Sequence, residues 1–497
     1  MDNLKTRLVR ILTPVLLAGS AASADEALID GSEMLDAAAA ASDIGIVRDR
    51  LEHIHPGYDR YTDADHLAGL WSVLETRAAD GLSRGELYLE LSRVLAAIRC
   101  DHTRAELPDD MAAARNTVPI YLPFQFVLFD GRMYVDEASP DSGLARGAEI
   151  THIDGRAVGD WLAAVQPLMP VDGDAAHTAP AEIAYSTEFM GPGFDHFAPF
   201  LADIETTVNL QVLQADGSRT VTATRLTYAQ YQTLVGKQRY SSNFSDSIRF
   251  ERLGDDAAYL AVDSFINYRQ SVDAMATLAP YFEILMKEKR DKLIVDLRRN
   301  GGGSSDARAA LLRHLITRPV HAVAAVVTRF DRLSDATRRY LSTWNEAALN
   351  PQPKWFRAAD DGFFELVAPG LAPHTGPVPP ADQAFAGELA VLIGPGNSSG
   401  STHLLAVLAN AGRGLFVGEK TGGAPTGATA GIIYLLTLPE SGIKVRIPGQ
   451  RTIIAKWDRL PARDGLEPAI AAPMTRDDYF AGRDPALEAA KRALAIE

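Results

Sequence analysis

Three consecutive glycines, Gly301 to Gly303, are the first feature of the sequence that could do chemistry. They follow an apolar run at 293–297 and precede a helical pattern over 306–316. Glycine leaves its backbone N–H groups uncovered, and a helix amino terminus favours negative charge. Such a loop can hold a phosphate or the oxyanion of a reaction intermediate. The sequence does not follow the nucleotide-binding glycine patterns and no lysine follows, so nucleotide binding is not favoured. A purely structural turn is the alternative interpretation.

A second loop, Gly394 to His403, also lies between an apolar run and an apolar helical segment. It reads Gly-Pro-Gly-Asn-Ser-Ser-Gly-Ser-Thr-His. A serine at such a turn from strand to helix can expose its hydroxyl as a nucleophile, and the N–H groups after it can stabilise developing charge. Serine is also a good helix N-cap, so capping is the alternative interpretation of this loop taken alone.

The two loops together resemble the tail-specific, or carboxyl-terminal-processing, serine peptidases, a family that includes the related tricorn core. The family motif Asp-Leu-Arg-x-Asn-Gly-Gly-Gly is matched at each fixed position by Asp296 to Gly303. Two later motifs, Gly-Arg and Val-Gly-Glu-x-Thr-x-Gly, are matched without gaps by Gly412-Arg413 and residues 417–423. Counting back from these motifs implies that Ser399 is the nucleophile, with Ser398 as the second choice.

Two positions depart from the family pattern. Thr402 stands where the family has an acidic residue, and Ala424 stands where the Ser–Lys members have their general base. A serine hydroxyl needs a base, because it is a poor nucleophile at neutral pH. The resemblance to the tricorn branch implies a histidine from the amino-terminal region, and Cys100-Asp101-His102-Thr103 matches that place. His102 is therefore the predicted base, and the ordinary pKa of histidine suits this role.

Other residues compete for these roles. His403 lies one helical turn after Ser399 and is a rival base, although the family has an apolar residue there. Cys100 is a poorer candidate nucleophile, because nothing around it resembles a cysteine protease. His102 itself could merely cap or pack.

The acid that orients the histidine stays open. Asp101 is adjacent to His102 in sequence but could point away from it. Glu419 is the recurrent glutamate of the family but could only bridge strands. The tricorn branch places its acid in the region of three further residues, none of which aligns cleanly: Asp458, Asp464 and Glu467.

A short histidine-rich stretch before these motifs could suggest a metal. It contains His53-x-His55, followed by Asp63-x-Asp65-His66. A zinc site in a protein needs three or four convergent ligands, and a third convergent ligand is not evident. We therefore expect these side chains to be solvated loop residues, and we expect neither a metal nor another cofactor.

Two regions precede the loop-bearing part of the chain. Residues 25–116 are expected to be helical, because apolar residues recur near helical spacing. From about residue 118 the pattern becomes strand–turn–strand, with turns at Asp130-Gly131 and Asp216-Gly217. The run 144–158 between them resembles the middle of a PDZ domain, so we expect a PDZ-like domain at 117–227 with a helical insertion.

The remaining residues, 228–497, should form an α/β core that carries both loops. Short apolar runs at 257–262, 293–297 and 389–393 are typical of buried parallel strands, with helices between them. The resemblance implies a crotonase-like architecture for this core. The predicted fold class is therefore α/β, with a crotonase-like core, a PDZ-like domain and an amino-terminal helical region.

The composition is that of a globular chain with an export signal. Its 497 residues are 46% hydrophobic and 23% charged, which argues against disorder, and its net charge of −15 argues against a nucleic-acid partner. Residues 1–24 combine basic residues, the apolar run Ile11 to Leu17 and a final Ala22-Ser23-Ala24, the pattern of a cleaved signal peptide, with an uncleaved anchor as the alternative interpretation. No later run reaches about 20 apolar residues, so stable membrane insertion is not expected.

The sequence thus predicts an exported serine endopeptidase, periplasmic or secreted, that acts on peptides or proteins. His102 would deprotonate Ser399, and the N–H groups of Gly301 or Gly302 and of Gly400 would hold the oxyanion. The alternative is a catalytically inactive relative that binds a peptide or another ligand on the same scaffold, which the two departures from the family pattern favour. The sequence leaves the oligomeric state open.

Overall fold

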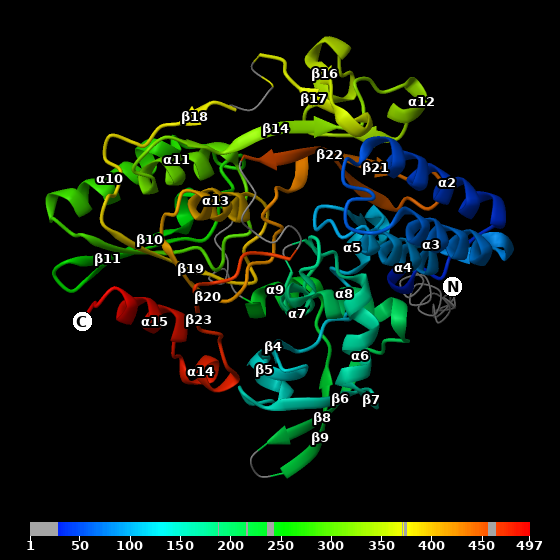
Figure 1. Cartoon of the computed structure of the whole chain (residues 1–497). Helices are drawn as coiled ribbons and strands as arrows, with labels where there is room; N and C mark the ends of the chain where they lie inside the picture. The colour runs from blue at the N-terminus through cyan, green and yellow to red at the C-terminus, as the bar shows by residue number, and fades with distance from the viewer. Residues whose placement is uncertain are drawn as a thin grey trace, which may run out of the picture.

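The computed structural model describes residues 28–186, 188–214, 217–235, 243–369, 371, 375–455 and 464–497. The expected signal peptide at 1–24 and the candidate acid Asp458 lie outside the described residues. The described chain is a mixed α/β protein with amino-terminal helices, an antiparallel sheet and a larger α/β region (Figure 1). None of its helices is long and apolar enough to cross a bilayer.

Three helices fill most of the region predicted to be helical: α2 (Ala37–Ile54), α3 (Ala64–Arg77) and α4 (Arg84–Ala97). Helix α4 begins with a capping box, in which the Ser83 side chain accepts from Glu86 N and the Glu86 carboxylate accepts from Ser83 N. This sequence signal explains why the helix starts there. Its apolar side chains then lie in the core.

The segment after α4 leads directly into a strand of another part of the fold. β3 (Arg104–Glu106) pairs antiparallel with β22 (Lys444–Ile454), with Ala105 opposite Val445. The connection at 98–103, which carries His102, is therefore fixed at one end by a buried helix and at the other by a strand of the carboxyl-terminal half.

The two hairpins expected at 117–227 are present and belong to one antiparallel sheet. Its strands follow the order β4-β5-β6-β8-β9, and β7 (Arg156–Ala157) pairs with β6. The other strands are β4 (Phe124–Phe129), β5 (Arg132–Ala138), β6 (Glu149–Ile153), β8 (Thr207–Gln214) and β9 (Gly217–Thr224). The long segment between β6 and β8 contains α6 (Val158–Val165), α7 (Ala179–Ala184) and α8 (Gly193–Leu201).

A six-stranded sheet forms the centre of the α/β region. Its order is β10-β11-β12-β19-β20-β23, and all neighbours are parallel except β10 and β11. The strands are β10 (Ile248–Leu253), β11 (Ala257–Val262), β12 (Lys292–Asp296), β19 (Glu388–Ile393), β20 (Leu415–Gly418) and β23 (Ile470–Ala471). The three apolar runs read as parallel strands in the sequence are β11, β12 and β19.

Helices cover both faces of this sheet. Leu293 and Val295 share a hydrophobic cluster with three helices, α10 (Ala274–Lys287), α11 (Ser305–Leu315) and α13 (Ser399–Asn410). Ile294, which points to the opposite face, packs in a separate cluster with α15 (Pro485–Ala493). The alternation along β12 is what a strand buried on both faces requires.

A second sheet connects the core to the amino-terminal helices. Its order is β15-β21-β22-β14-β17-β16, with β3 added to β22. These strands are β14 (Val323–Thr328), β15 (Leu341–Ser342), β16 (Phe356–Ala358), β17 (Phe364–Leu366) and β21 (Thr429–Thr437). The long strands β21 and β22 lie between α13 and the amino-terminal helices in Figure 1.

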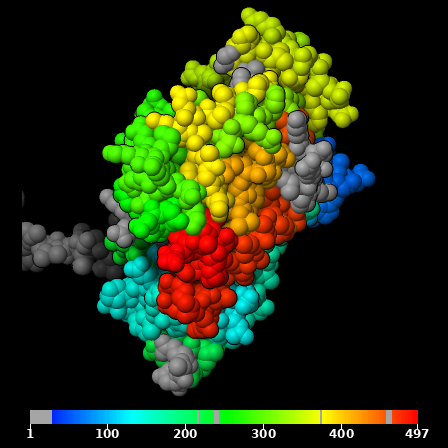
Figure 2. Space-filling model, turned by 60° about the vertical axis from the view of Figure 1, so that its left-hand side comes forward, coloured from blue at the N-terminus to red at the C-terminus, as the bar shows by residue number. Residues whose placement is uncertain are grey.

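The carboxyl-terminal segment joins the antiparallel sheet to the core at the surface. In Figure 2 this segment, coloured red, lies between the cyan residues of that sheet and the green and orange residues of the core. Helix α14 (Arg476–Ala481) supplies the contact: Tyr479 Oη donates to Asp136 Oδ2 at 2.8 Å. Arg146 lies over the ring of Phe480, 4.9 Å from its centroid.

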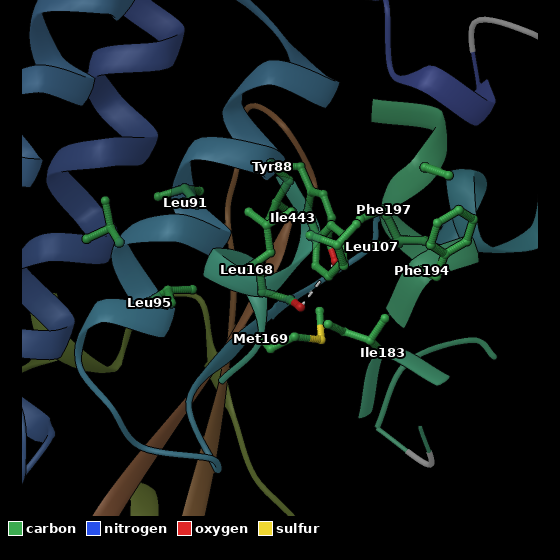
Figure 3. Close-up of a cluster of buried hydrophobic side chains, with 14 of the residues drawn as sticks. Tyr88, Leu91, Leu95, Leu107, Leu168, Met169, Ile183, Phe194, Phe197 and Ile443 are labelled. Carbon is green, nitrogen blue, oxygen red and sulfur yellow. Dashed lines mark hydrogen bonds between the residues drawn. The ribbon is translucent and has the colours of Figure 1, made fainter. Parts of the chain in front are cut away.

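One hydrophobic cluster runs through all three predicted regions. It joins the amino-terminal helices, the antiparallel sheet with its helices, and strands β21 and β22. Figure 3 shows part of it, where Tyr88 of α4 lies near Phe197 of α8, with ring centroids 6.0 Å apart. The loops of these regions are thus held in fixed positions by a shared core.

Candidate active site

Ser399 lies at a sharp turn from β19 into α13. Its φ of +48° is the left-handed conformation that non-glycine residues adopt rarely, and it is typical of a strained nucleophile turn. The side chain of Asn397 holds this turn: its Nδ2 donates to Leu297 O, and its Oδ1 accepts from Gly394 N at 2.9 Å. The elbow expected from the sequence is present.

His102 brings an imidazole to this serine from the other end of the chain. Its Nε2 lies 3.2 Å from Ser399 Oγ, which is hydrogen-bond distance for a base and a nucleophile. The two residues are 297 positions apart in sequence.

Asp101 lies on the other side of the imidazole. Its Oδ1 is 2.5 Å from His102 Nδ1, so the carboxylate and the ring nitrogen are in direct contact. The second oxygen of Asp101 accepts a hydrogen bond from Ser398 Oγ. Of the candidate orienting acids that the structure describes, Asp101 is therefore the one that contacts the histidine.

The Asp101–His102 contact shifts both pKa values in the direction of an ion pair. Burial by itself would lower the pKa of His102, but the adjacent Asp101 carboxylate outweighs it and holds that pKa well above the ordinary value. Burial would likewise raise the pKa of Asp101, yet the imidazolium charge and the hydrogen bonds lower it. The pair therefore favours a protonated imidazole more than an isolated histidine does.

The histidine loop has a second, unexpected support in His55. This residue is fully buried, so the expectation that it is a solvated loop residue is wrong. Its Nδ1 accepts from Gly57 N at 3.0 Å, which leaves Nε2 to donate to Thr103 Oγ1 at 2.7 Å. Burial, followed by Arg329, lowers the pKa of His55 to about 3, so it stays neutral. The pairing with the residue after His102 was not foreseen.

The glycine run lies directly against the nucleophile. Gly302 has a φ of +107°, and a Cβ added there would lie 2.7 Å from Gly400 N and 2.9 Å from Ser399 Cβ. The absence of a side chain is thus what allows the two loops to meet. The two glycine-containing loops are therefore in direct contact at Gly302.

One predicted oxyanion donor is already engaged. Gly302 N donates to Asn300 Oδ1 at 2.8 Å, so it cannot also donate to an oxyanion without giving up that bond. Within the described chain, the N–H groups of Gly301 and Gly400 have no such partner. Gly303 N, which the sequence analysis did not single out, lies next to Gly400: a Cβ on Gly400 would be 3.4 Å from it.

The rival candidates lie in other environments. Arg308 donates to Nδ1 of His403 at 3.0 Å, and His403 Nε2 contacts Ala322 O at 3.0 Å, so both ring nitrogens are occupied. Burial and Arg308 lower the pKa of His403 to about 3. The thiol of Cys100 is buried and contacts Thr429 O.

Glu419 and the two described acids near it do not reach the histidine. Burial raises the pKa of Glu419, and within the described chain no hydrogen bond or ion pair joins it to His102. Asp464 and Glu467 both form ion pairs with Lys420, at 2.5 and 3.0 Å. The ion pairs with Lys420 thus engage Asp464 and Glu467 away from the imidazole.

The positions that depart from the family pattern have defined partners. Thr402 Oγ1 donates to Asn397 O at 3.2 Å, so it supports the nucleophile turn. Ala424 N donates at 2.9 Å to Asp172 Oδ2, a carboxylate from the segment between α6 and α7. Asp172 was not predicted, and its only signal in the sequence is a turn-like Asp-Gly pair.

Among the described residues, one trio could hold a metal ion: Cys100, Asp101 and His102, with one ligand atom each within 4.8 Å of the others. Two of these residues are the ones that face Ser399 and Ser398. The trio therefore belongs to the serine–histidine arrangement. His53 contacts Asp49, and Asp63 caps α3, so the other residues considered for a metal do not converge.

Comparison with known proteins relates the chain to peptidases. Residues 256–470 match the family described as Peptidase family S41. The structure of mature CPAF complexed with lactacystin is 15% identical and superposes with a TM-score of 0.58, covering 92% of this chain and 97% of CPAF. A CPAF mutant is 14% identical with a TM-score of 0.62, covering 92% and 96%. These two similarities show a shared fold.

A third solved structure, the photosystem II D1 C-terminal processing protease, is 18% identical with a TM-score of 0.40 and covers 91% of this chain and 97% of that one. No curated protein sequence matches the chain.

Proposed function

We propose that this chain, whose residues 256–470 match peptidase family S41, is a serine-type peptidase that hydrolyses peptide bonds with Ser399 as nucleophile and His102 as base. The observation that carries the proposal is the 3.2 Å distance between His102 Nε2 and Ser399 Oγ. Because Ala424 replaces the lysine of the Ser–Lys members, His102 takes over the base role that this lysine has in them.

The reaction begins with proton transfer from Ser399 to neutral His102. Nε2 accepts the hydroxyl proton as Oγ attacks the carbonyl carbon of the peptide bond. The imidazolium that forms lies beside the Asp101 carboxylate, which stabilises its charge. The same imidazolium then donates its proton to the leaving amine, and water releases the acyl group by the reverse sequence.

The oxyanion of the tetrahedral intermediate needs donors next to Ser399. Gly400 N follows the nucleophile and has no other acceptor within the described chain. We assign the second donor to the glycine run, where Gly303 N lies next to Gly400 and Gly301 N is the other unengaged group. Each well-placed donor contributes about 10²-fold or more to the rate of such reactions.

Ser398 has a supporting role. Its hydroxyl donates to Asp101 Oδ2, so it holds the carboxylate beside the imidazole. The serine that was the second choice for nucleophile thus contacts the acid, and Ser399 contacts the base.

A fluorophosphonate probe tests the proposal directly, because it bonds covalently to an activated serine. The purified chain should gain the mass of one probe, and peptide mapping should place it on Ser399. His102→Gln should slow labelling by about 10²-fold or more, whereas Ser398→Ala should still be labelled. An unlabelled native protein would instead favour the inactive, peptide-binding relative.

The remaining parts of the proposal concern substrate and location. We propose that the five main strands β4-β5-β6-β8-β9 form a PDZ-like domain, that the parallel core is crotonase-like, and that a peptide substrate binds in a cleft between them, adding as a strand. We also propose that residues 1–24 are removed during export to the periplasm or medium. Amino-terminal sequencing of protein from the native host should find Asp25 first; an intact Met1 would refute the export proposal.

A further inference from the structure

A buried carboxylate from a third segment interacts electrostatically with Asp101 and His102. Asp172 is 4% exposed, and its Oδ2 accepts a hydrogen bond from Ala424 N at 2.9 Å. Ala424 occupies the position of the family's lysine base, so this carboxylate lies against the backbone from which a lysine side chain would otherwise extend. The Asp172 carboxylate thus lies beside the position that carries a lysine in the Ser–Lys members.

The segment that carries Asp172 is tied to the histidine loop and to the segment after β20 that carries Ala424. Gly173 N donates to Arg99 O at 2.9 Å, and Asp174 forms an ion pair with the Arg99 side chain, just before Asp101 and His102. On the other side, His177 Nε2 contacts Thr421 O at 3.0 Å. The position of the segment is therefore set by direct contacts.

The hydrophobic core also fixes this segment, through the residues just before Asp172. Leu168 and Met169, which come shortly before Asp172, are buried in the cluster with Leu95 of α4 (Figure 3). Leu95 in turn comes shortly before His102. Two short connections from one packed cluster thus lead to the carboxylate and to the histidine, which limits how far they can move apart.

We propose that Asp172 is a positioning residue of the serine–histidine site, a second carboxylate whose negative charge, held against Ala424, strengthens the hold of the Asp101–His102 pair on its proton. The inference rests on the proposed function of His102 as the base. Asp172 does not contact Ser399 or the imidazole, so it acts through the electric field at the pair.

The charges around Asp172 agree with this role. Burial is the main cause that raises its pKa, and the negative charge of Asp101 is the next, so that the pKa reaches about 7. Arg60 and His102 act in the opposite direction, and Tyr61 is a further neighbour whose pKa Asp172 raises. Near neutral pH the protein therefore switches between a charged and an uncharged Asp172.

The test is the titration of His102, which can be followed by NMR of its ring whether or not the protein cleaves peptides. Asp172→Asn keeps an acceptor for Ala424 N–H and removes the charge. The His102 pKa should fall by about 0.5 unit or more, because a nearby negative charge no longer stabilises the imidazolium. Asp172→Ser, which introduces a smaller uncharged residue, should also lower the His102 pKa. It serves as the second variant if Asp172→Asn does not fold.

Asp174→Asn is the matched control, since it removes an exposed charge that pairs with Arg99 at the surface, while the hydrogen bond from Gly173 N to Arg99 O still holds the segment in place. It should leave the His102 titration unchanged. The acid limb of fluorophosphonate labelling should move with the His102 pKa in the Asp172 variants. A titration that does not move in either Asp172 variant overturns the inference. If the His102 titration moves in the Asp172 variants but the probe never labels the native protein, only the proposed function is refuted.

Discussion

Ser398 donates a hydrogen bond to Asp101, which is 297 residues away in the sequence. The residues that follow these two, Ser399 and His102, form a second contact. Two dipeptides therefore face each other residue by residue. The pairing separates the roles of two adjacent serines that the sequence motif alone could not separate. It also means that replacing one serine tests the site without removing the other contact.

We expect Ser399→Ala to lower kcat by about 10⁴-fold or more, since the nucleophile is lost. Ser398→Ala should lower kcat by only about 10-fold, the scale of one hydrogen bond to a charged group. Steady-state cleavage of a peptide by the two variants, with melting temperatures as a check of folding, measures both. The reverse order of effects would transfer the nucleophile to Ser398.

The pH dependence of kcat/KM should have its acid limb above pH 6.5. His102 must be neutral to accept a proton, and the Asp101 carboxylate raises the pKa of His102 well above its ordinary value despite burial. Activity is therefore lost as pH falls through that raised pKa, and it is greatest on the alkaline side. A rate profile over a broad pH range gives the midpoint.

Asp101→Asn is the companion variant for this profile. Without the carboxylate the pKa of His102 should fall, so the acid limb should move to lower pH while the plateau drops by roughly 10²-fold. Glu419→Gln is the control, because Glu419 does not contact the imidazole. If the acid limb moved in Glu419→Gln and stayed in place in Asp101→Asn, the orienting acid would be Glu419.

Gly302→Ala should damage both stability and activity. The φ of +107° disfavours any side chain, and a Cβ would lie 2.9 Å from Ser399 Cβ, so the nucleophile must shift. We expect a loss of about 1 kcal/mol or more in the free energy of unfolding and a fall in kcat of about 10²-fold. Urea unfolding and peptide cleavage measure the two effects.

Gly301→Ala is the matched control from the same run. The nearest atom to a Cβ there is Gly396 O at 3.9 Å, and its backbone does not have a positive φ. This variant should fold and cleave nearly as the native protein does. Equal losses in both variants would show that the run is sensitive as a whole and that the close approach of Gly302 to Ser399 is not the cause.

His55→Leu should destabilise the protein by about 1–3 kcal/mol, because it leaves Thr103 Oγ1 and Gly57 N buried without a partner. The loop that holds His102 should loosen as well, so kcat should fall. His66→Leu, at an exposed position nearby, should change the free energy of unfolding little. Denaturant unfolding distinguishes the two, and equal effects would contradict the support we assign to His55.

The features that could be predicted from the sequence are those with a local pattern. The apolar strands at 257–262 and 389–393, the turn at Ser399 and the glycine run each combine composition with spacing, and the structure has them as expected. Their physical causes act over a few residues, so a short stretch of sequence contains the whole signal. His102 needed the family resemblance, because nothing local separates a base from a packed histidine.

The contacts that could not be predicted are between segments far apart in the chain. Asp172 reaches Ala424 and Ser398 reaches Asp101 only because the segments pack together, and no periodicity encodes that packing. His55 is expected in a solvated loop because no third metal ligand is evident in the sequence, yet packing places it in the core. The engaged N–H of Gly302 similarly depends on the rotamer of Asn300.

The pairing of β3 with β22 has a consequence for the order of events during synthesis. The base comes from the first quarter of the chain, but the strand that fixes its loop and the helix that presents the serine are among the last elements to be made. A growing or truncated chain that ends before residue 444 therefore lacks strand β22, which pairs with β3 and fixes the loop of His102. The arrangement delays assembly of the catalytic pair until the polypeptide is nearly complete, so an unfinished molecule cannot attack its neighbours.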